Sequence, residues 1–234
     1  MKRIVLEANF LGLVVVAIAA TIGVLTACST NAQNQAQAGN SGATNAGDRH
    51  SMTHSDMNHS SRMNHSMMDL GPADAEFDLR FIDSMIPHHE GAVSMAEEVL
   101  QKSKRPELKK LAQEIIKAQE KEINQMKQWR TAWYPKAPST PIAWHAQMGH
   151  SMFMSKDQMR VMRMDIDLGT ADDNFDRRFI DAMIPHHEGA VVMAKDVLQK
   201  SKRPEILQLA KNIIASQQAE IDQMKQWRKA WYRK

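Results

Sequence analysis

A methionine followed at short spacing by two adjacent histidines is the pattern in this sequence that most clearly indicates metal binding. The motif Met-Ile-Pro-His-His begins at Met85 and recurs at Met183. On a helix, Met85 would share one face with His88 and His89, which lie three and four residues further on. Thioether sulfur is a soft neutral ligand and imidazole is a borderline one. A site built from both, without carboxylates, suits Cu(I) or Ag(I) best and Cu(II) less well.

The motif lies inside a duplicated segment. Residues 77–134 and 175–232 align without a gap, with 42 identities in 58 positions. Each copy predicts two helices, in the first copy over residues 77–102 and 106–134. Pro106 suits the first turn of the second helix, where its missing N–H is not needed. The short connection predicts that the two helices are antiparallel neighbours.

The apolar stripes of these helices indicate the fold class. A helical wheel places Met85 and His88 on an inward stripe, and Asp83, Pro87 and Gly91 on the opposite side. We therefore predict an all-α protein, in which the duplicated antiparallel hairpin forms a four-helix bundle with flexible Met/His-rich segments. The alternative is two hairpins that dimerise between chains.

The hairpin geometry also indicates how a metal site is assembled. Met126 follows the hairpin turn by about as many residues as Met85 precedes it, so the two should meet at the same end of the hairpin. A site of two thioethers and one or two imidazoles follows. Packing is the competing explanation, because a buried methionine usually fills a gap in a core.

Two further Met/His-rich tracts precede the repeats, in residues 49–70 and within the linker 135–170. The first has almost no aliphatic residues, so Met68 and the other methionines there should have no packing role, and metal capture by a flexible chain is the preferred interpretation. An oxidant sponge or simple low complexity are the alternatives. The candidate ligands are His50, Met52, His54, Met57, His59, Met63, His65 and Met67, and in the linker His145, Met148, His150, Met152 and Met154.

The amino terminus predicts export. Residues 1–27 have the basic start and short apolar run of a signal peptide. They end before Cys28 in a lipobox-like sequence, which predicts a lipid anchor on Cys28; ordinary cleavage after Ala27 is the alternative. Residues 28–48 predict a flexible tether, and the hairpins occupy residues 71–134 and 171–234.

Composition excludes several classes of protein. Cys28 is the only cysteine, and the net charge is +3 with 18 methionines and 10 histidines. If Cys28 is lipidated, the mature chain has no disulfide, cysteine–zinc site or cysteine nucleophile. The balanced charge gives no sign of nucleic-acid binding, and membrane contact is expected only through the lipid anchor.

Residues 81–96 resemble the signature M-I-x-H-H-x-x-A-x-x-M-A of a bacterial family, catalogued as a domain of unknown function with a ferritin-like four-helix fold. The double copy with Met/His-rich segments particularly resembles a cyanobacterial periplasmic copper-resistance protein of that family. The resemblance implies a periplasmic Cu(I)/Ag(I) binder. The ligands it implies are Met85, His88, His89, Met95 and Met126, and in the second copy Met183, His186, His187, Met193 and Met224.

The expected function is sequestration of Cu(I) or Ag(I) in the periplasm, conferring copper resistance, with a copper efflux system or a copper sensor as the candidate partner. We expect no enzymatic activity, because the sequence shows no nucleophile beside a base and no phosphate-binding loop. Three alternatives stay open at this point: a Cu(I) oxidase, a haem-binding bundle with Met and His axial ligands, and an envelope interaction protein whose methionines are only core.

Overall fold

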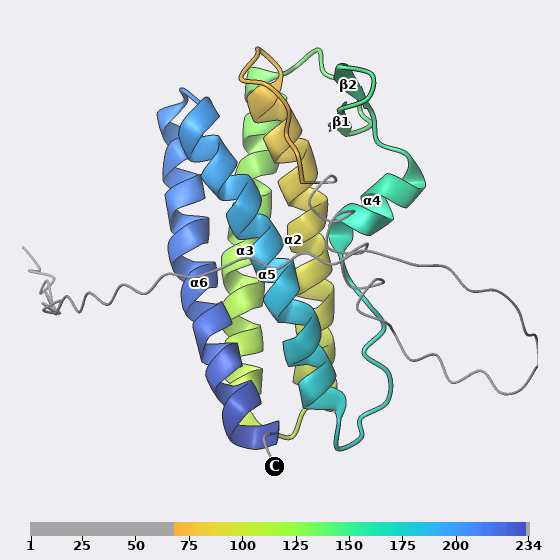
Figure 1. The fold of residues 1–234 in the computed structure, drawn as a ribbon, viewed down its shortest axis with the longest axis vertical. Helices are drawn as coiled ribbons and strands as arrows, with labels where there is room; N and C mark the ends of the chain where they lie inside the picture. Colours follow the sequence, from red (N-terminus) through yellow and green to blue (C-terminus); the bar gives the residue numbers. More distant parts are fainter. Residues whose placement is uncertain (1–67, 233–234) are drawn as a thin grey trace, which may run out of the picture. The chain divides into compact units, whose positions relative to one another are not determined.

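Four long helices lie side by side in the computed structural model, which describes residues 68–232 (Figure 1). They are α2 (Phe77–Lys102), α3 (Pro106–Trp133), α5 (Phe175–Lys200) and α6 (Pro204–Tyr232). Each repeat forms one hairpin, and α2 packs directly against α5. The four-helix bundle is therefore confirmed, and both hairpins belong to one chain.

The helix boundaries follow local signals in the sequence. Pro106 begins α3 at the position where its missing N–H costs nothing. The helix ends at Trp133, one residue before the predicted end. Pro87 lies inside α2 without ending the helix. The predicted signal peptide, the tether, Cys28 and the first tract up to Met67 lie outside the described residues.

The two repeats pack side by side in opposite directions and share two core clusters. One core cluster joins the first half of α2 and the end of α3 to the second half of α5 and the start of α6. A second cluster contains the complementary halves. Because neither hairpin encloses a core alone, burial of apolar side chains between the repeats stabilises the whole bundle.

At both ends of the bundle, an arginine of one repeat contacts a tryptophan and an aspartate of the other repeat. The Arg203 guanidinium lies 4.4 Å from the centre of the Trp133 ring, and its Nε lies 3.3 Å from the Asp78 carboxylate. Arg105 makes the equivalent contacts, 4.2 Å from Trp231 and 3.3 Å from Asp176. The loop of each hairpin thus packs on the far end of the other.

The linker between the repeats is ordered, which the prediction of a flexible segment did not anticipate. It forms the antiparallel strands β1 (Ile142–His145) and β2 (His150–Phe153), followed by α4 (Lys156–Arg163). Ser155 and Gln158 cap α4 reciprocally. Both β1 and α4 pack on α2, and in Figure 1 they lie to the right of that helix.

This extra layer explains why the helical wheel was wrong about one face of α2. Asp83, Pro87 and Gly91 were expected outside and are buried. The Asp83 carboxylate accepts hydrogen bonds from Arg130 Nε at 2.5 Å and from the backbone N–H of Ile142 at 2.9 Å. A wheel assumes that one face of a helix meets solvent, whereas here the linker covers that face.

The prediction that the methionines of the first tract have no packing role was wrong for Met68, the one of them that the structure describes. Met68 is buried in the first core cluster, and Met154 is buried in the linker. Met148 and Met152 do face solvent.

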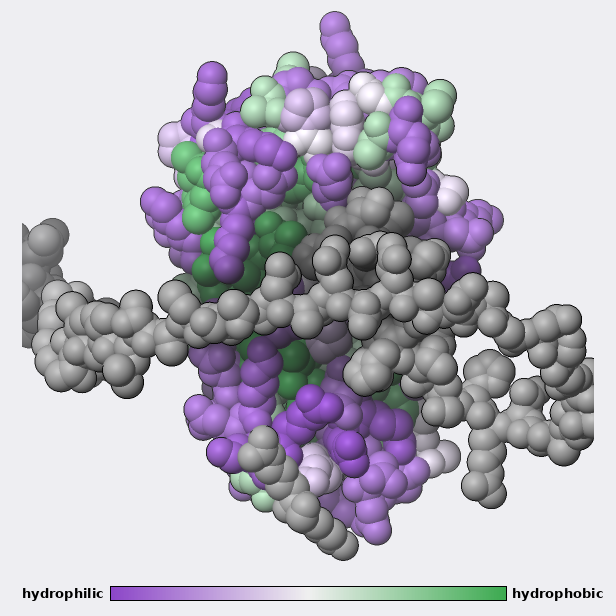
Figure 2. Space-filling model, in the orientation of Figure 1, coloured by the Kyte–Doolittle hydropathy of each residue, from purple (hydrophilic) through white to green (hydrophobic). Residues whose placement is uncertain are grey.

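Figure 2 shows a predominantly hydrophilic face with hydrophobic patches between the polar side chains. Among the described residues, no helix is both long and apolar enough to cross a membrane.

Candidate metal centre

Four buried imidazoles form a row through the middle of the bundle. The rings follow the order His89, His88, His186, His187, with centres separated by 6.4, 3.9 and 6.2 Å. All four residues are fully buried. The two central rings belong to different repeats, so the row crosses the interface between α2 and α5.

Each outer histidine is held by a carboxylate from the neighbouring helix. His89 Nε2 lies 2.8 Å from Glu122 Oε2, and His187 Nε2 lies 2.6 Å from Glu220 Oε2. An ionised carboxylate only accepts, so Nε2 carries the hydrogen and donates it. Nδ1 of both rings is buried without a hydrogen-bond partner. Metal-binding histidines commonly use this arrangement, in which one nitrogen donates to a carboxylate and the other holds the metal.

The central histidines are kept neutral by their surroundings. Burial lowers the pKa of His88 well below its ordinary value, and the neighbouring histidines, His186 first, lower it further. Burial, followed by the neighbouring His187, lowers the pKa of His186 to about 3. Near neutral pH these rings are therefore uncharged, which is the form that binds metals.

Six buried methionines lie in the core of the bundle in two groups. The first Met set is Met85, Met126 and Met193, all in the first core cluster. The second Met set is Met183, Met224 and Met95, all in the second cluster. Met126 therefore lies in the same cluster as Met85, as the hairpin geometry predicted. Met95 and Met193, however, each join the set of the other repeat.

This crossing changes the expectation that each hairpin carries a complete site. Because α2 and α5 run antiparallel, the second half of each helix lies beside the first half of the other. Each set thus combines two thioethers from one repeat with one from the other.

The donors fit a soft monovalent ion. Thioethers and the free Nδ1 atoms of His89 and His187 are neutral ligands that Cu(I) and Ag(I) accept. In residues 68–232, no three His, Cys, Asp or Glu side chains gather closely enough to hold a metal. A carboxylate-rich di-iron site would need such a group. Core packing explains the burial of the methionines equally well, but it does not explain why each of the four imidazoles in the row has a buried Nδ1 without a partner.

The linker residues predicted as ligands do not join the bundle site. On the hairpin of β1 and β2, His145 and His150 face each other in register. Met148 and Met152 are exposed on the same hairpin, whereas Met154 is buried. The ligand assignments for these residues, and for the bundle histidines and methionines, stay predictions.

Sequence reasoning missed three residues that the structure places at the site. Glu122 and Glu220, which hold the outer histidines, were not among the predicted site residues. Their duplication at an inner position was the signal that could have revealed them. Met68 was not among the predicted ligands, and its sulfur lies near His88 Nε2 across Gly189. No helical spacing could have placed Met68 there, because Met68 precedes α2.

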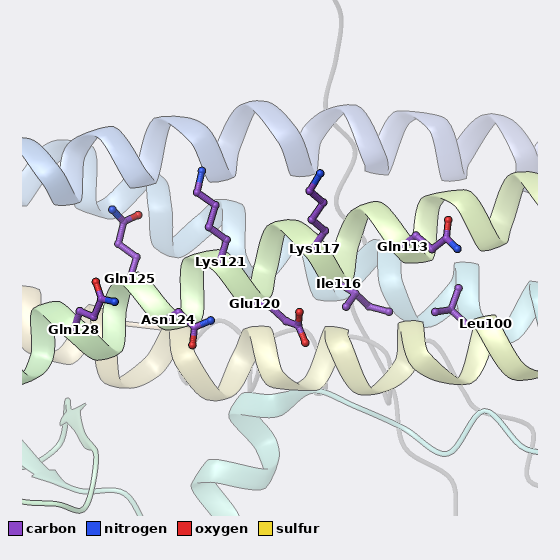
Figure 3. A pocket seen from close by; sticks show the side chains of 9 residues that line it. All are labelled: Leu100, Gln113, Ile116, Lys117, Glu120, Lys121, Asn124, Gln125 and Gln128. Carbon is purple, nitrogen blue, oxygen red and sulfur yellow. The ribbon is translucent and has the colours of Figure 1, made fainter.

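A surface groove along α3 has a different character. Figure 3 shows its lining side chains, which come from α3 except for Leu100 near the end of α2. They are mostly Gln, Lys, Glu and Asn, and none is Met or His. We therefore place the candidate metal centre in the interior of the bundle and not in this groove.

Comparison with known proteins gives the class to which this fold and site belong. The family model described as "Domain of unknown function (DUF305)" matches residues 18–130 and 78–228. The chain, a duplicated helical hairpin with a Met- and His-lined interior, belongs to the DUF305 family.

Solved structures of CopM are similar to this chain over about two thirds of its length. CopM in the Cu(I)-bound form is 44% identical and covers 67% of this chain and 98% of its own, with a TM-score of 0.53. CopM in the Cu(II)-bound form is 46% identical over 66% of this chain and 97% of its own, with the same TM-score. An Ag-bound form obtained by soaking is 42% identical, with coverages of 67% and 98% and a TM-score of 0.53.

A viral relative shares a shorter segment. The uncharacterized protein L153 of Acanthamoeba polyphaga mimivirus is 47% identical over 49 residues, which is 21% of this chain. The match spans about a third of that protein, 32% of its length.

Proposed function

We propose that this protein binds Cu(I) and Ag(I) inside its helical bundle, without turnover, and so lowers the concentration of free metal. The observation that carries the proposal is the pair of outer histidines. In each, a carboxylate holds Nε2 while the buried Nδ1 has no partner. His89 lies one helical turn from Met85 and His187 one turn from Met183, so each ring has a thioether on its own helix face.

The similarity to CopM supports the choice of metal, because CopM has been solved with Cu(I), Cu(II) and Ag. The ligands rank these ions in this chain. Neutral thioethers favour the two monovalent ions, and the imidazoles give Cu(II) a weaker alternative. We assign one soft ion to each Met set with its outer histidine.

We further propose that sequestration takes place in the periplasm and contributes to copper resistance. The signal-peptide pattern of residues 1–27 supports export, and the lipobox-like sequence before Cys28 supports an anchor. A copper efflux system or sensor would then receive the metal. Mass spectrometry of the mature amino terminus tests the anchor: a diacylated Cys28 is expected, and an unmodified residue at the cleavage site would contradict it.

A competition titration tests the binding proposal. The reduced mature chain is titrated with Cu(I) against a chromophoric chelator, beside the variant Met85→Leu/Met126→Leu/Met193→Leu. We expect at least two tightly held equivalents in the wild type and one fewer in the variant. Met162→Leu is the matched control, because Met162 is buried in the same core cluster but belongs to neither Met set. Less than one tight equivalent in the wild type would contradict the proposal.

A second experiment separates metal binding from catalysis. An oxygen electrode records whether Cu(I) addition to the aerobic protein consumes oxygen. We expect a stable complex and no uptake beyond that of free Cu(I). Sustained uptake would replace the proposal with a Cu(I) oxidase.

A further inference from the structure

Two equivalent glycines let α2 and α5 be approached closely, and different groups use the space. A Cβ on Gly91 would overlap the carbonyl oxygen of Arg163. A Cβ on Gly189, the matching residue of the second repeat, would lie 2.8 Å from Met68 Sδ and 3.2 Å from His88 Nε2. The sulfur and the ring nitrogen therefore converge on one point over Gly189.

The two central histidines consequently have different partners. His186 Nε2 lies 2.9 Å from the carbonyl oxygen of Arg163 and donates a hydrogen to it. His88 has no such acceptor, and both of its ring nitrogens are buried without a hydrogen-bond partner. A neutral imidazole has one donor and one acceptor nitrogen, and leaving both unpaired in a core costs free energy. A carbonyl satisfies Nε2 of His186, whose Nδ1 has no partner, whereas Nε2 of His88 lies with Met68 Sδ over the same glycine.

We propose that Met68 Sδ and His88 Nε2 form a third soft-metal site, over Gly189, for Cu(I) or Ag(I). The ligands are one neutral thioether and one neutral imidazole, the same chemistry as in the two Met sets. The inference rests on the proposed function for the identity of the metal. It adds a site that the internal duplication does not predict. At the equivalent position over Gly91, beside His186, lies the carbonyl oxygen of Arg163 and not the sulfur of a methionine.

The position of Met68 in the chain gives this site a distinct place in the protein. Met68 ends the Met/His-rich tract of residues 49–68 and immediately precedes the bundle. Its side chain is buried in the first core cluster, together with Met85, Met126 and Met193. The third site therefore joins the first tract to the bundle interior.

The test uses the mature chain and its Met68→Leu variant, which keeps the volume of the side chain and removes the sulfur. Ag(I) equivalents are counted by competition, and the imidazole nitrogens are followed by ¹⁵N NMR of histidine-labelled protein. We expect Met68→Leu to lose one Ag(I) equivalent and the Ag(I)-dependent shift of His88 Nε2. Met162→Leu, another buried methionine of the same cluster, should behave as the wild type.

A second variant, Gly189→Ala, keeps both ligands and fills the space between them. It should lose the same equivalent, since its Cβ would displace the flexible end of Met68. Full Ag(I) stoichiometry in Met68→Leu with an unchanged His88 shift would overturn the third site and leave the proposed function standing. A wild-type protein that takes up no Ag(I) would overturn both.

Discussion

The fully buried His89 and the partly buried Glu122 form a hydrogen-bonded pair across the first hairpin, with 2.8 Å between Nε2 and Oε2. The pair leaves His89 Nδ1 as a buried lone pair without a partner. His187 and Glu220 repeat the arrangement in the second hairpin at 2.6 Å. Both repeats thus have not only the histidine but also the carboxylate that fixes the orientation of its ring.

Replacement of these carboxylates should weaken metal binding without unfolding the bundle. In Glu122→Gln/Glu220→Gln the amide can still occupy the space but no longer fixes which imidazole nitrogen carries the hydrogen. Loss of such a partner typically lowers metal affinity by about 10- to 100-fold, and a chelator competition assay measures the change for Cu(I). Glu120→Gln, on the exposed side of α3, is the control. Equal affinities in all three proteins would remove the carboxylates from the site.

The crossed Met sets predict which substitutions influence one another. Met95 shares a cluster with Met183, whereas Met85 lies in the other cluster. Double-mutant cycles of Cu(I) affinity should therefore show coupling between Met95→Leu and Met183→Leu, and additivity between Met95→Leu and Met85→Leu. Coupling of Met95 to Met85 alone would show that each hairpin binds metal by itself.

Asp83 and Asp181 occupy equivalent positions in the two repeats but should differ in their contribution to stability. The Asp83 side chain is 1% exposed and binds Arg130 and the N–H of Ile142, whereas the Asp181 side chain is 34% exposed. Asp83→Asn should lower the free energy of unfolding by about 1 to 2 kcal/mol, because it removes the charge-assisted hydrogen bond to Arg130 in a buried position. Asp181→Asn should cost about 0.5 kcal/mol. Urea denaturation measures both, and equal effects would show that the linker layer adds nothing to stability.

The metal-free protein should lose stability in acid. The pKa of His186 is lowered to about 3 and that of His88 is also lowered, while in the unfolded chain histidines titrate near pH 6.5. Their stabilising contribution is therefore complete above about pH 6.5, and it falls as the unfolded chain takes up protons below that pH. Each histidine should remove about 1.4 kcal/mol per pH unit.

Urea denaturation from pH 7 to pH 5 in the presence of a chelator measures this slope. The variant His88→Gln/His186→Gln should have a shallower slope than the wild type, whatever its stability at pH 7. An equally steep slope in the variant would assign the acid sensitivity to other groups.

The sequence was sufficient for the bundle because its repeat and its apolar stripes are both local and periodic. The boundaries of α2 and the pairing of Met85 with Met126 follow from such spacing. The linker layer could not be predicted in this way, since Asp83 and Gly91 are buried by segments more than 50 residues away. The grouping of Met95 with the second repeat, and the position of Met68 and His88 over the same glycine, depend on how the two repeats pack, which no single repeat encodes.

The most direct test of the account asks whether the buried methionines are ligands. Methyl-labelled methionine NMR of the mature chain during Ag(I) titration follows every thioether at once, with single Met→Leu variants to assign the signals. We predict that the methyl signals of Met85, Met126 and Met193, and of Met183, Met224 and Met95, shift within the first equivalents. Shifts confined to other methionines, with these six unchanged, would contradict a metal centre inside the bundle.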